Sequence, residues 1–166
     1  MSLKVFDLEY LNVISSKAQL NPRSRQHQNI HESYEEPCQR LLNAIEPNSY
    51  IRPHRHSSHP CSELLFAARG SLVFLTFDNS GEISEVIHFG TNNHSKMVIG
   101  LEVTPDIWHT VVALETGCVL LEVKAGPFDP KNPKDLAKWA PSENDPAAKN
   151  YLDYLKSRIK ENSLLK

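Results

Sequence analysis

Four residues of this sequence carry side chains that bind divalent metals, at a spacing that suits one site. His54 and His56 are separated by a single residue, Glu63 opens the next apolar run, and His109 begins a later one. Side chains two positions apart on an extended strand point to the same side, so both histidines of the first pair can reach one ion. Three imidazoles and a carboxylate also leave coordination positions open for water or substrate. We therefore predict one divalent metal ion, and Fe, Zn, Mn and Ni are all compatible with these donors.

Neighbouring strands must bring the other two ligands to this pair. A strand that returns antiparallel beside the histidine strand would bring the carboxylate of Glu63 to the same face, and His109 would add an imidazole from a further strand. The six residues SSHPCS separate His56 from Glu63 and make His59 a reserve ligand. The alternative is that this segment is a solvated loop and that His109 is an ordinary hydrogen-bonded core residue.

The region from about Gln39 to Lys124 has the pattern of an all-β domain. Short apolar or alternating runs are separated by turn sequences, and no helix of crossover length interrupts them. A Gly-containing turn at residues 78–81, between two runs of β-branched and aromatic residues, marks the clearest hairpin. The predicted strands are residues 39–45, 62–69, 71–77, 83–89, 97–103, 109–114 and 118–123.

Helices are expected on both sides of the strands. Asp7 can cap a first helix whose apolar residues share one face, and Pro22 lies just past its end. The stretch from residue 125 to 148 contains five prolines and predicts an irregular arm held by Phe128 and Trp139. A C-terminal amphipathic helix follows, with basic residues near its end where the helix dipole favours cations. We predict a single domain made of an N-terminal helix and arm (1–37), a barrel core (38–125), and a Pro-rich arm with a C-terminal helix (126–166).

The ligand residues resemble the first motif of the cupin superfamily, which reads G, five residues, HxH, three or four residues, E, six residues, G. Its places are occupied by Asn48, His54, His56, Glu63 and Gly70. Asn in place of the leading Gly is a mild departure because Asn tolerates positive φ, whereas the longer loop before Glu63 is a larger one. The second cupin motif is matched only at His109, and Ala113 replaces its Asn. The resemblance implies a mainly β fold, a single jelly-roll β-barrel with a metal inside.

The chain also resembles the WbuC family of cupin-fold metalloproteins. The likeness spans most of residues 8–125 and includes SKAQLNPRSRQHQNIHESYEEPCQRLLNAIEPNSYIRPHRH. It implies a metal-binding cupin associated with the biosynthesis of bacterial surface polysaccharide of the O-antigen type, without a defined reaction. Three hypotheses follow: a metal-dependent sugar isomerase or epimerase in which Glu63 or a bound hydroxide moves a proton, an Fe(II)-dependent dioxygenase, and a non-catalytic ligand-binding or sensing module.

Polar residues recur with a period of two in the segment RSRQHQNIH. If this segment is a strand, one face carries Arg23, Arg25, His27, Asn29 and His31. With Gln39 and Arg40 nearby at the mouth of the barrel, such a face would offer donors for the phosphate or carboxylate of a small anionic sugar or sugar nucleotide. The alternative is a polar edge strand that faces water.

Two aromatic residues close to the predicted ligands are further candidates. Trp108 precedes His109 and could stack on a sugar ring. Tyr50 precedes the histidine strand and could take part in catalysis with Glu63 by donating to a metal-bound intermediate. Packing in the barrel is the alternative for both, and Cys61 is more typical of a small apolar filler than of a reactive thiol.

The overall composition argues against several kinds of partner. The 18 Lys and Arg residues against 20 Asp and Glu give a net charge of −2, which offers no basic surface for nucleic acid and no polybasic membrane anchor. A signal peptide and an apolar run long enough to span a bilayer are not recognisable, so we expect a cytoplasmic protein. Three cysteines without a CxxC pair fit reduced thiols. An exposed edge strand could pair with a twofold mate, so a homodimer is expected.

Overall fold

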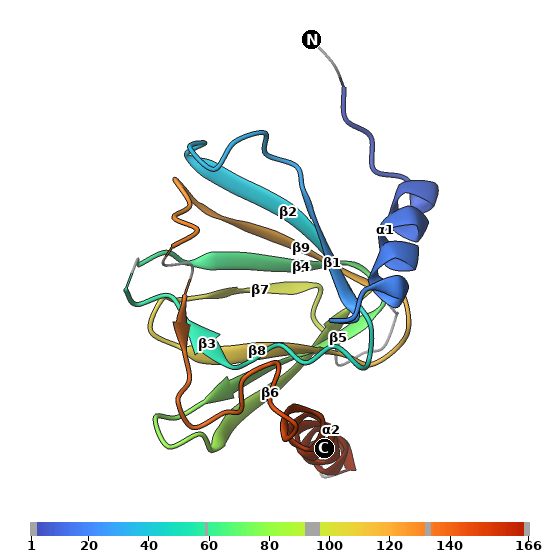
Figure 1. Ribbon diagram of the computed structural model, residues 1–166. Helices are drawn as coiled ribbons and strands as arrows, with labels where there is room; N and C mark the ends of the chain where they lie inside the picture. Colours follow the sequence, from blue (N-terminus) through green and yellow to red (C-terminus); the bar gives the residue numbers. More distant parts are fainter. Residues whose placement is uncertain (1–2, 59, 92–96, 132–133, 165–166) are drawn as a thin grey trace.

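The computed structural model describes residues 3–58, 60–91, 97–131 and 134–164 and has a layered architecture (Figure 1). Two antiparallel sheets pack face to face, with helix α1 outside one and helix α2 outside the other. Strand order is β1-β2-β9-β4-β7 in the first sheet and β10-β3-β8-β5-β6 in the second, so the chain crosses repeatedly between sheets as in a jelly roll. Within the described residues the elements are α1 (Leu8–Leu20), β1 (Arg25–Asn29), β2 (Cys38–Ile45), β3 (His54–Arg55), β4 (Glu63–Arg69), β5 (Ser71–Phe77), β6 (Ile83–Gly90), β7 (Gly100–Val103), β8 (Trp108–Ala113), β9 (Cys118–Ala125), β10 (Asp135–Leu136) and α2 (Ala148–Leu164).

The seven predicted strands are confirmed, as β2 and as β4 to β9. The hairpin of β5 and β6 has the expected turn, in which Asp78 Oδ1 accepts hydrogen bonds from the backbone N–H groups of Ser80 (2.8 Å) and Glu82 (3.0 Å). Three shorter strands join them: β1 at the edge of the first sheet, and β3 and β10 in the second. Because β1 pairs along its whole length with β2, the first sheet begins well before residue 38.

Helix α1 forms as its sequence pattern predicts. Asp7 is the N-cap, and its side chain accepts a hydrogen bond of 2.8 Å from the backbone N–H of Tyr10. Leu11, Ile14 and Ala18 are buried on one face of the helix. They pack on the outward-facing residues of the first sheet, which are Leu42, Ala44 and Val119. This contact covers the outer face of that sheet with apolar side chains.

Helix α2 covers the outer face of the second sheet in the same way (Figure 1). Leu152, Leu155 and Ile159 recur at helical spacing and pack against side chains of β5 and β8. The prediction of basic residues at its C-terminal end is wrong, because the helix continues to Leu164 and its last turn contains no basic residue. Neither helix, over the residues described, is long and apolar enough to cross a membrane.

The space between the sheets is apolar at one end only. Phe74, Phe89 and Leu72 from the second sheet meet Ile45 and Leu65 from the first, and all five are buried. Towards the other end, the side chains between the sheets become polar and charged. Apolar packing at one end therefore sets the distance between the sheets. The polar side chains at the other end lie across that same distance.

The Pro-rich arm after β9 is held by the two predicted aromatic residues. The ring of Trp139 lies 5.1 Å from that of Phe77, and the ring of Phe128 lies 5.1 Å from that of Tyr34. Between them the arm forms β10, which pairs with β3. The arm thereby crosses from the first sheet to the second.

Truncation of a buried residue in α2 tests how much this helix contributes to stability. Leu155→Ala removes a fully buried side chain and is expected to lower the free energy of unfolding by about 2–5 kcal/mol. Lys160→Ala, at an exposed position of the same helix, should change it by less than about 0.5 kcal/mol. Urea titration of both variants provides the measurement. Equal effects of the two substitutions would contradict the packing of α2 on the sheet.

Candidate metal centre

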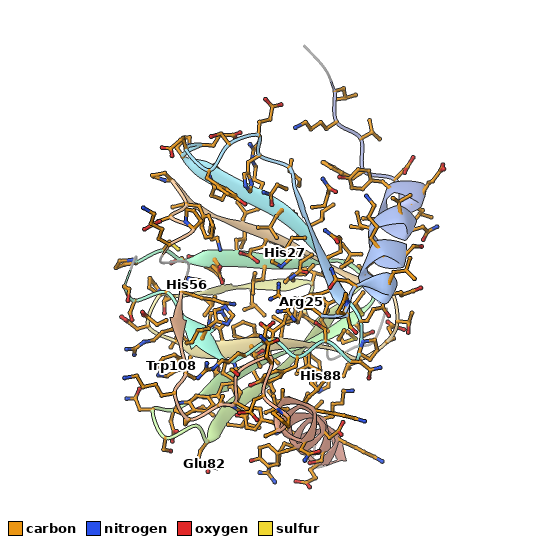
Figure 2. The ribbon with its side chains drawn as sticks, viewed as in Figure 1. Arg25, His27, His56, Glu82, His88 and Trp108 are labelled. Atoms are coloured by element: carbon orange, nitrogen blue, oxygen red, sulfur yellow. The ribbon has the colours of Figure 1, made fainter. Side chains whose placement is uncertain are left out.

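The four predicted metal ligands lie together between the sheets. His54 on β3 and His109 on β8 are directly paired across their strands. One donor atom each from His54, His56, Glu63 and His109 lies within 4.8 Å of every other, and all four residues are buried. The side chain of His56 extends into the space between the two layers (Figure 2). The fold therefore assembles the cluster that the sequence pattern indicates.

Glu63 reaches the cluster by a different route from the one expected. Strand β4 does not run beside β3: it lies in the first sheet between β9 and β7, whereas β3 lies in the second sheet between β10 and β8. The carboxylate of Glu63 therefore crosses the interior to meet histidines from the opposite layer. The cluster depends on how the two sheets pack and not on the register of one strand pair alone.

Backbone carbonyl groups orient two of the imidazole rings. His54 Nδ1 lies 3.0 Å from the carbonyl oxygen of Arg52, and His109 Nδ1 lies 2.8 Å from that of Ile107. A carbonyl oxygen can only accept, so each Nδ1 carries a proton and each Nε2 is the ring nitrogen left for a metal. Metal-binding histidines are held in the same way.

The Nε2 atom of His56 suits a metal better than a hydrogen bond. It lies 3.1 Å from Glu63 Oε1, yet it is buried and makes no hydrogen bond with any described group. Leaving such an atom unpaired costs about 1–3 kcal/mol. A cation between the imidazole and the carboxylate would satisfy both groups, because each would direct a lone pair towards it.

The spread of the donor atoms also fits a single ion. Metal–nitrogen and metal–oxygen bonds of about 2.1 Å place ligands on opposite sides of one ion about 4.2 Å apart. Because no pair of donors here exceeds 4.8 Å, shifts of a few tenths of an ångström would bring all four within bonding range. Phe74 stacks on the ring of His109 at a centroid distance of 5.3 Å. The residues present can hold one divalent ion with three nitrogen donors and one oxygen donor.

The protonation of the ligands favours metal binding. Burial lowers the pKa of His54 well below its usual value, and the charge of Lys134 lowers it further. Burial alone would raise the pKa of Glu63, but contacts with His109 and His56 and the charge of Lys124 hold it well below its usual range. At neutral pH the imidazole is therefore neutral and the carboxylate ionised, as coordination requires.

A cavity of about 230 Å³ opens onto the cluster. Its apolar wall includes Ile51, Leu65, Val111, Leu120 and Phe128. Its charged residues are the cations Arg23, Arg25, Lys124 and Lys134 and the carboxylates Glu63 and Glu122, with His27, Asn43 and the three cluster histidines making up the remainder. Cations outnumber carboxylates even before any metal ion is counted.

Lys124 bridges the carboxyl groups of Glu63 and Glu122 at the edge of the cluster. Its Nζ atom lies 2.9 Å from Glu63 Oε1 and 2.7 Å from Glu122 Oε1. Burial raises the pKa of Glu122, and the neighbouring charge of Glu63 adds to this effect. The two carboxyl groups therefore differ in pKa: Glu63 is held ionised, whereas Glu122 takes up a proton more readily.

The polar strand predicted around residue 25 contributes part of the expected binding face. Arg23, Arg25 and His27 line the cavity, and of the two that Figure 2 labels, Arg25 is buried and His27 is exposed. Arg25 forms an ion pair with Glu143 and donates 2.9 Å to the carbonyl of Tyr50. His27 is exposed on β1, yet desolvation by the surrounding protein and the charge of Arg25 lower its pKa to about 4.

The other candidates from that prediction lie outside the cavity. Asn29 is exposed, and His31 is tied to the backbone of Arg40, with Nδ1 at 2.8 Å from its carbonyl oxygen and 3.0 Å from its amide nitrogen. Gln39 donates to the carbonyls of Tyr34 (3.1 Å) and Glu36 (2.8 Å), which makes it a brace for a turn. Arg40 pairs with Glu36; as the neighbour of Gln39 on a regular strand it faces the opposite side. For these four residues the proposed substrate contact is not supported.

The two aromatic candidates are packing residues in this structure. The hydroxyl of Tyr50 donates 2.9 Å to the carbonyl of Pro141, and its ring packs in the cluster under α2. Trp108 lies beneath the guanidinium of Arg55 at 4.4 Å, and its indole N–H donates 3.1 Å to Asn79. Neither residue lines the cavity. The catalytic role expected for Tyr50 and the stacking role expected for Trp108 therefore lack a geometric basis.

Several cavity residues were missed from the sequence. Asn43, Glu122 and Lys124 occur in runs that read as ordinary strands, and Lys134 occurs in the irregular arm. Their role depends on strand pairing: Asn43 lies opposite His27, and Lys124 lies opposite Glu63. The only local signal was a charged or amide side chain within an apolar run.

The departures from the cupin motif have simple structural readings. Ser24 is the one non-glycine residue with positive φ in the described part of the chain, so Asn48 does not use the conformational freedom for which it was considered tolerable. Gly70 does need its identity, because it has a φ of 82° and a Cβ there would lie 2.7 Å from Cys118 Sγ. The reserve ligand His59 lies outside the described residues.

Comparisons with known proteins agree with this fold. A family model described as "Domain of unknown function (DUF6016)" matches residues 6–89. No curated protein matches the chain. Protein SO0799 from Shewanella oneidensis is similar in structure with a TM-score of 0.52 and 12% identity, over 66% of this chain and 72% of that one. Oxalate decarboxylase from Bacillus subtilis gives a TM-score of 0.50 and 17% identity, over 68% of this chain but 27% of that one.

An RmlC-like cupin protein from Desulfovibrio desulfuricans is also similar, with a TM-score of 0.45 and 16% identity, over 62% of this chain and 82% of that one. At these identities the likeness concerns the fold alone. The two packed antiparallel sheets and the two flanking helices confirm the predicted cupin fold.

Removal of one cluster histidine tests the metal site. We expect protein purified without an affinity tag to contain about one metal ion per chain and His56→Ala to contain almost none, since three ligands hold the ion much less tightly. His27→Gln changes an imidazole of the same cavity that is outside the cluster and should retain the metal. Elemental analysis gives the ratio. Equal metal loss in both variants would place the ion elsewhere.

Lys134 makes the stability of the folded protein vary with pH in the alkaline range. Burial lowers the pKa of its ammonium group from 10.5 to about 8, and the charge of Arg25 contributes. Between these values the unfolded chain holds a proton that the folded chain has lost, so the free energy of unfolding rises with pH in that window. Below it, the folded protein carries the full cost of the buried charge.

We therefore expect Lys134→Met to be more stable than wild type near pH 7 and to lose this advantage as the pH rises from about 8 towards 10.5. Lys138→Met, at an exposed position of the same arm, should show a difference from wild type that does not vary with pH. Urea titrations at several pH values measure both. A constant difference for Lys134→Met would refute the linkage.

Proposed function

We propose, for a chain that belongs to the DUF6016 family, a mononuclear metalloprotein whose cupin cavity binds a small anionic ligand beside the metal ion. The observation that carries this proposal is the cluster of His54, His56, Glu63 and His109, whose donor atoms meet at a cavity rich in cations. The ion would supply Lewis acidity to a bound ligand. The rest of the chemistry belongs to the residues around it.

The charge of the cavity supports an anionic ligand. Arg23, Arg25, Lys124 and Lys134 face two carboxylates, and a divalent cation would add two further positive charges. Lys124 is balanced by Glu63 and Glu122, and both arginines pair with Glu143. The excess that remains comes from Lys134 and the metal ion. In a partly desolvated cavity such an imbalance favours a ligand that brings negative charge.

Glu63 and Glu122 divide the work of ligation and proton transfer. Glu63 has a lowered pKa and three positive or polar neighbours, which suits a permanent metal ligand. Glu122 has a raised pKa and lies in the same cavity, which suits a group that accepts and returns a proton. A proton-transfer reaction, such as isomerisation or epimerisation, would therefore use Glu122 in the role first considered for Glu63.

The wider context comes from the sequence resemblance to the WbuC family. That resemblance suggests a sugar or sugar nucleotide as the ligand and bacterial surface polysaccharide of the O-antigen type as the pathway. The charged cavity is compatible with the anionic part of such a ligand. An Fe(II)-dependent dioxygenase is the second candidate, since the same histidines and carboxylate also suit iron and leave positions for oxygen.

Small anions should bind only when the metal site is intact. Acetate at constant ionic strength is expected to raise the melting temperature of wild type in a concentration-dependent way. His56→Ala should show little of this effect, because the metal charge that draws the anion is lost. An equal response of the two proteins in thermal unfolding would show that acetate acts elsewhere.

The same preparations separate the candidate activities. Iron as the bound metal together with oxygen consumption favours the dioxygenase. Exchange of a substrate C–H proton with solvent favours the isomerase or epimerase. Stabilisation by ligands without turnover favours a binding or sensing role.

A further inference from the structure

The carbonyl oxygen of the Asn43 side chain faces the cavity without a partner. Asn43 is 5% exposed, lines the cavity, and its Oδ1 atom accepts no hydrogen bond from any group in the described structure. Strand β2 fixes its position, since Asn43 is paired with His27 on one side and Leu120 on the other. An unsatisfied buried carbonyl is costly, so a ligand that donates a hydrogen bond would bind favourably here.

Lys134 presents a second group that a ligand could engage. It reaches the cavity from the Pro-rich arm, and within the described ranges no carboxylate pairs with its ammonium group. The nearby carboxylates are already engaged, Glu63 by Lys124 and Glu143 by Arg25. A cation held near other cations without a counter-ion is unfavourable in the free protein. It becomes favourable once an anion occupies the cavity.

The two groups set complementary demands on one ligand. Oδ1 of Asn43 needs a donor, and the positive surroundings exclude an ammonium group as that donor. A hydroxyl group meets the first demand without adding charge, and a carboxylate meets the demand of Lys134. The volume of about 230 Å³ lies below the range of about 300–1,000 Å³ that holds drug-sized ligands. Only a small part of a nucleotide-linked sugar would fit within it.

We propose that the cavity binds a short hydroxycarboxylate, with its carboxylate against Lys134 and its hydroxyl donating to Asn43 Oδ1. This inference rests on the proposed metal-binding function and narrows its ligand to the size of a small hydroxy acid. Lys134 acts as the anchor for charge. Asn43 acts as the residue that distinguishes a hydroxyl from hydrogen or from an amine.

A three-carbon series tests both contacts. L-lactate, D-lactate, propionate and L-alanine share a skeleton and differ at one position, which is a hydroxyl in two configurations, a hydrogen or an ammonium group. Calorimetric titration of the metal-containing protein should give at least one lactate with affinity about tenfold above propionate, as expected for a hydrogen bond to a buried group. Alanine should bind no better than propionate.

Two substitutions should separate the roles. Asn43→Leu keeps the size of the side chain but removes the acceptor, and should reduce the preference for lactate over propionate from about tenfold to less than about twofold. Lys134→Met should weaken lactate and propionate alike by about tenfold or more and leave their ratio unchanged. Lys138→Met, exposed in the same arm, should bind both as wild type does.

Metal analysis of each sample keeps the outcomes distinct. Wild type without metal would overturn the proposed function itself. Metal-containing protein that does not prefer lactate would overturn only the hydroxycarboxylate inference. A lactate preference that survives in folded Asn43→Leu would show that the hydroxyl binds the metal and not Asn43. If Asn43→Leu fails to fold, the comparison of lactate with propionate in wild type and in Lys134→Met still decides the class of ligand.

Discussion

The meeting of the Glu63 carboxylate with imidazoles from the opposite sheet is the contact on which the site depends. The carboxylate is 4% exposed, and ionised groups are buried in proteins only when other charges or ligands compensate for lost water. Lys124 supplies one compensating charge. His56 and His109 approach from the other layer with Nε2 atoms at 3.1 and 3.4 Å from the two carboxylate oxygens. The donor atoms of the two layers therefore converge on one place, where a single divalent cation fits.

The apolar end of the sandwich makes this meeting reproducible. Phe74 is fully buried in the core and also stacks on His109, so the imidazole rests directly on the packed interior. Helices α1 and α2 bury the outer faces of the sheets. With apolar layers on both sides, each sheet has little freedom to shift relative to the other. The precision of the cluster is therefore a property of the whole sandwich, although the ligands themselves come from three short segments.

The sequence was sufficient for the strands and the ligands, but not for how the sheets combine. Period-two spacing placed His54 and His56 on one side, and it also placed Arg25 and His27 in the cavity. The same rule argues against Gln39 and Arg40 both contacting the cavity, because neighbouring residues of a strand face opposite sides. The sheet to which a strand belongs is not encoded in its own residues, because it depends on long-range pairing. For that reason the route of Glu63 was wrong, and Asn43 and Lys124 were not recognised as cavity residues.

The Pro-rich arm explains why the cavity cannot be understood from the sheets alone. It leaves β9 near Phe128, pairs with β3 through β10 beside the ligands, and brings Glu143 to Arg25. Prolines suit this path, since they favour extended backbone and need no ladder hydrogen bonds. Lys134 immediately precedes β10, so the strand pairing that anchors the arm also sets the position of the unpaired cation. The charge that the arm supplies acts on both the cavity and the cluster, because it also lowers the pKa of His54.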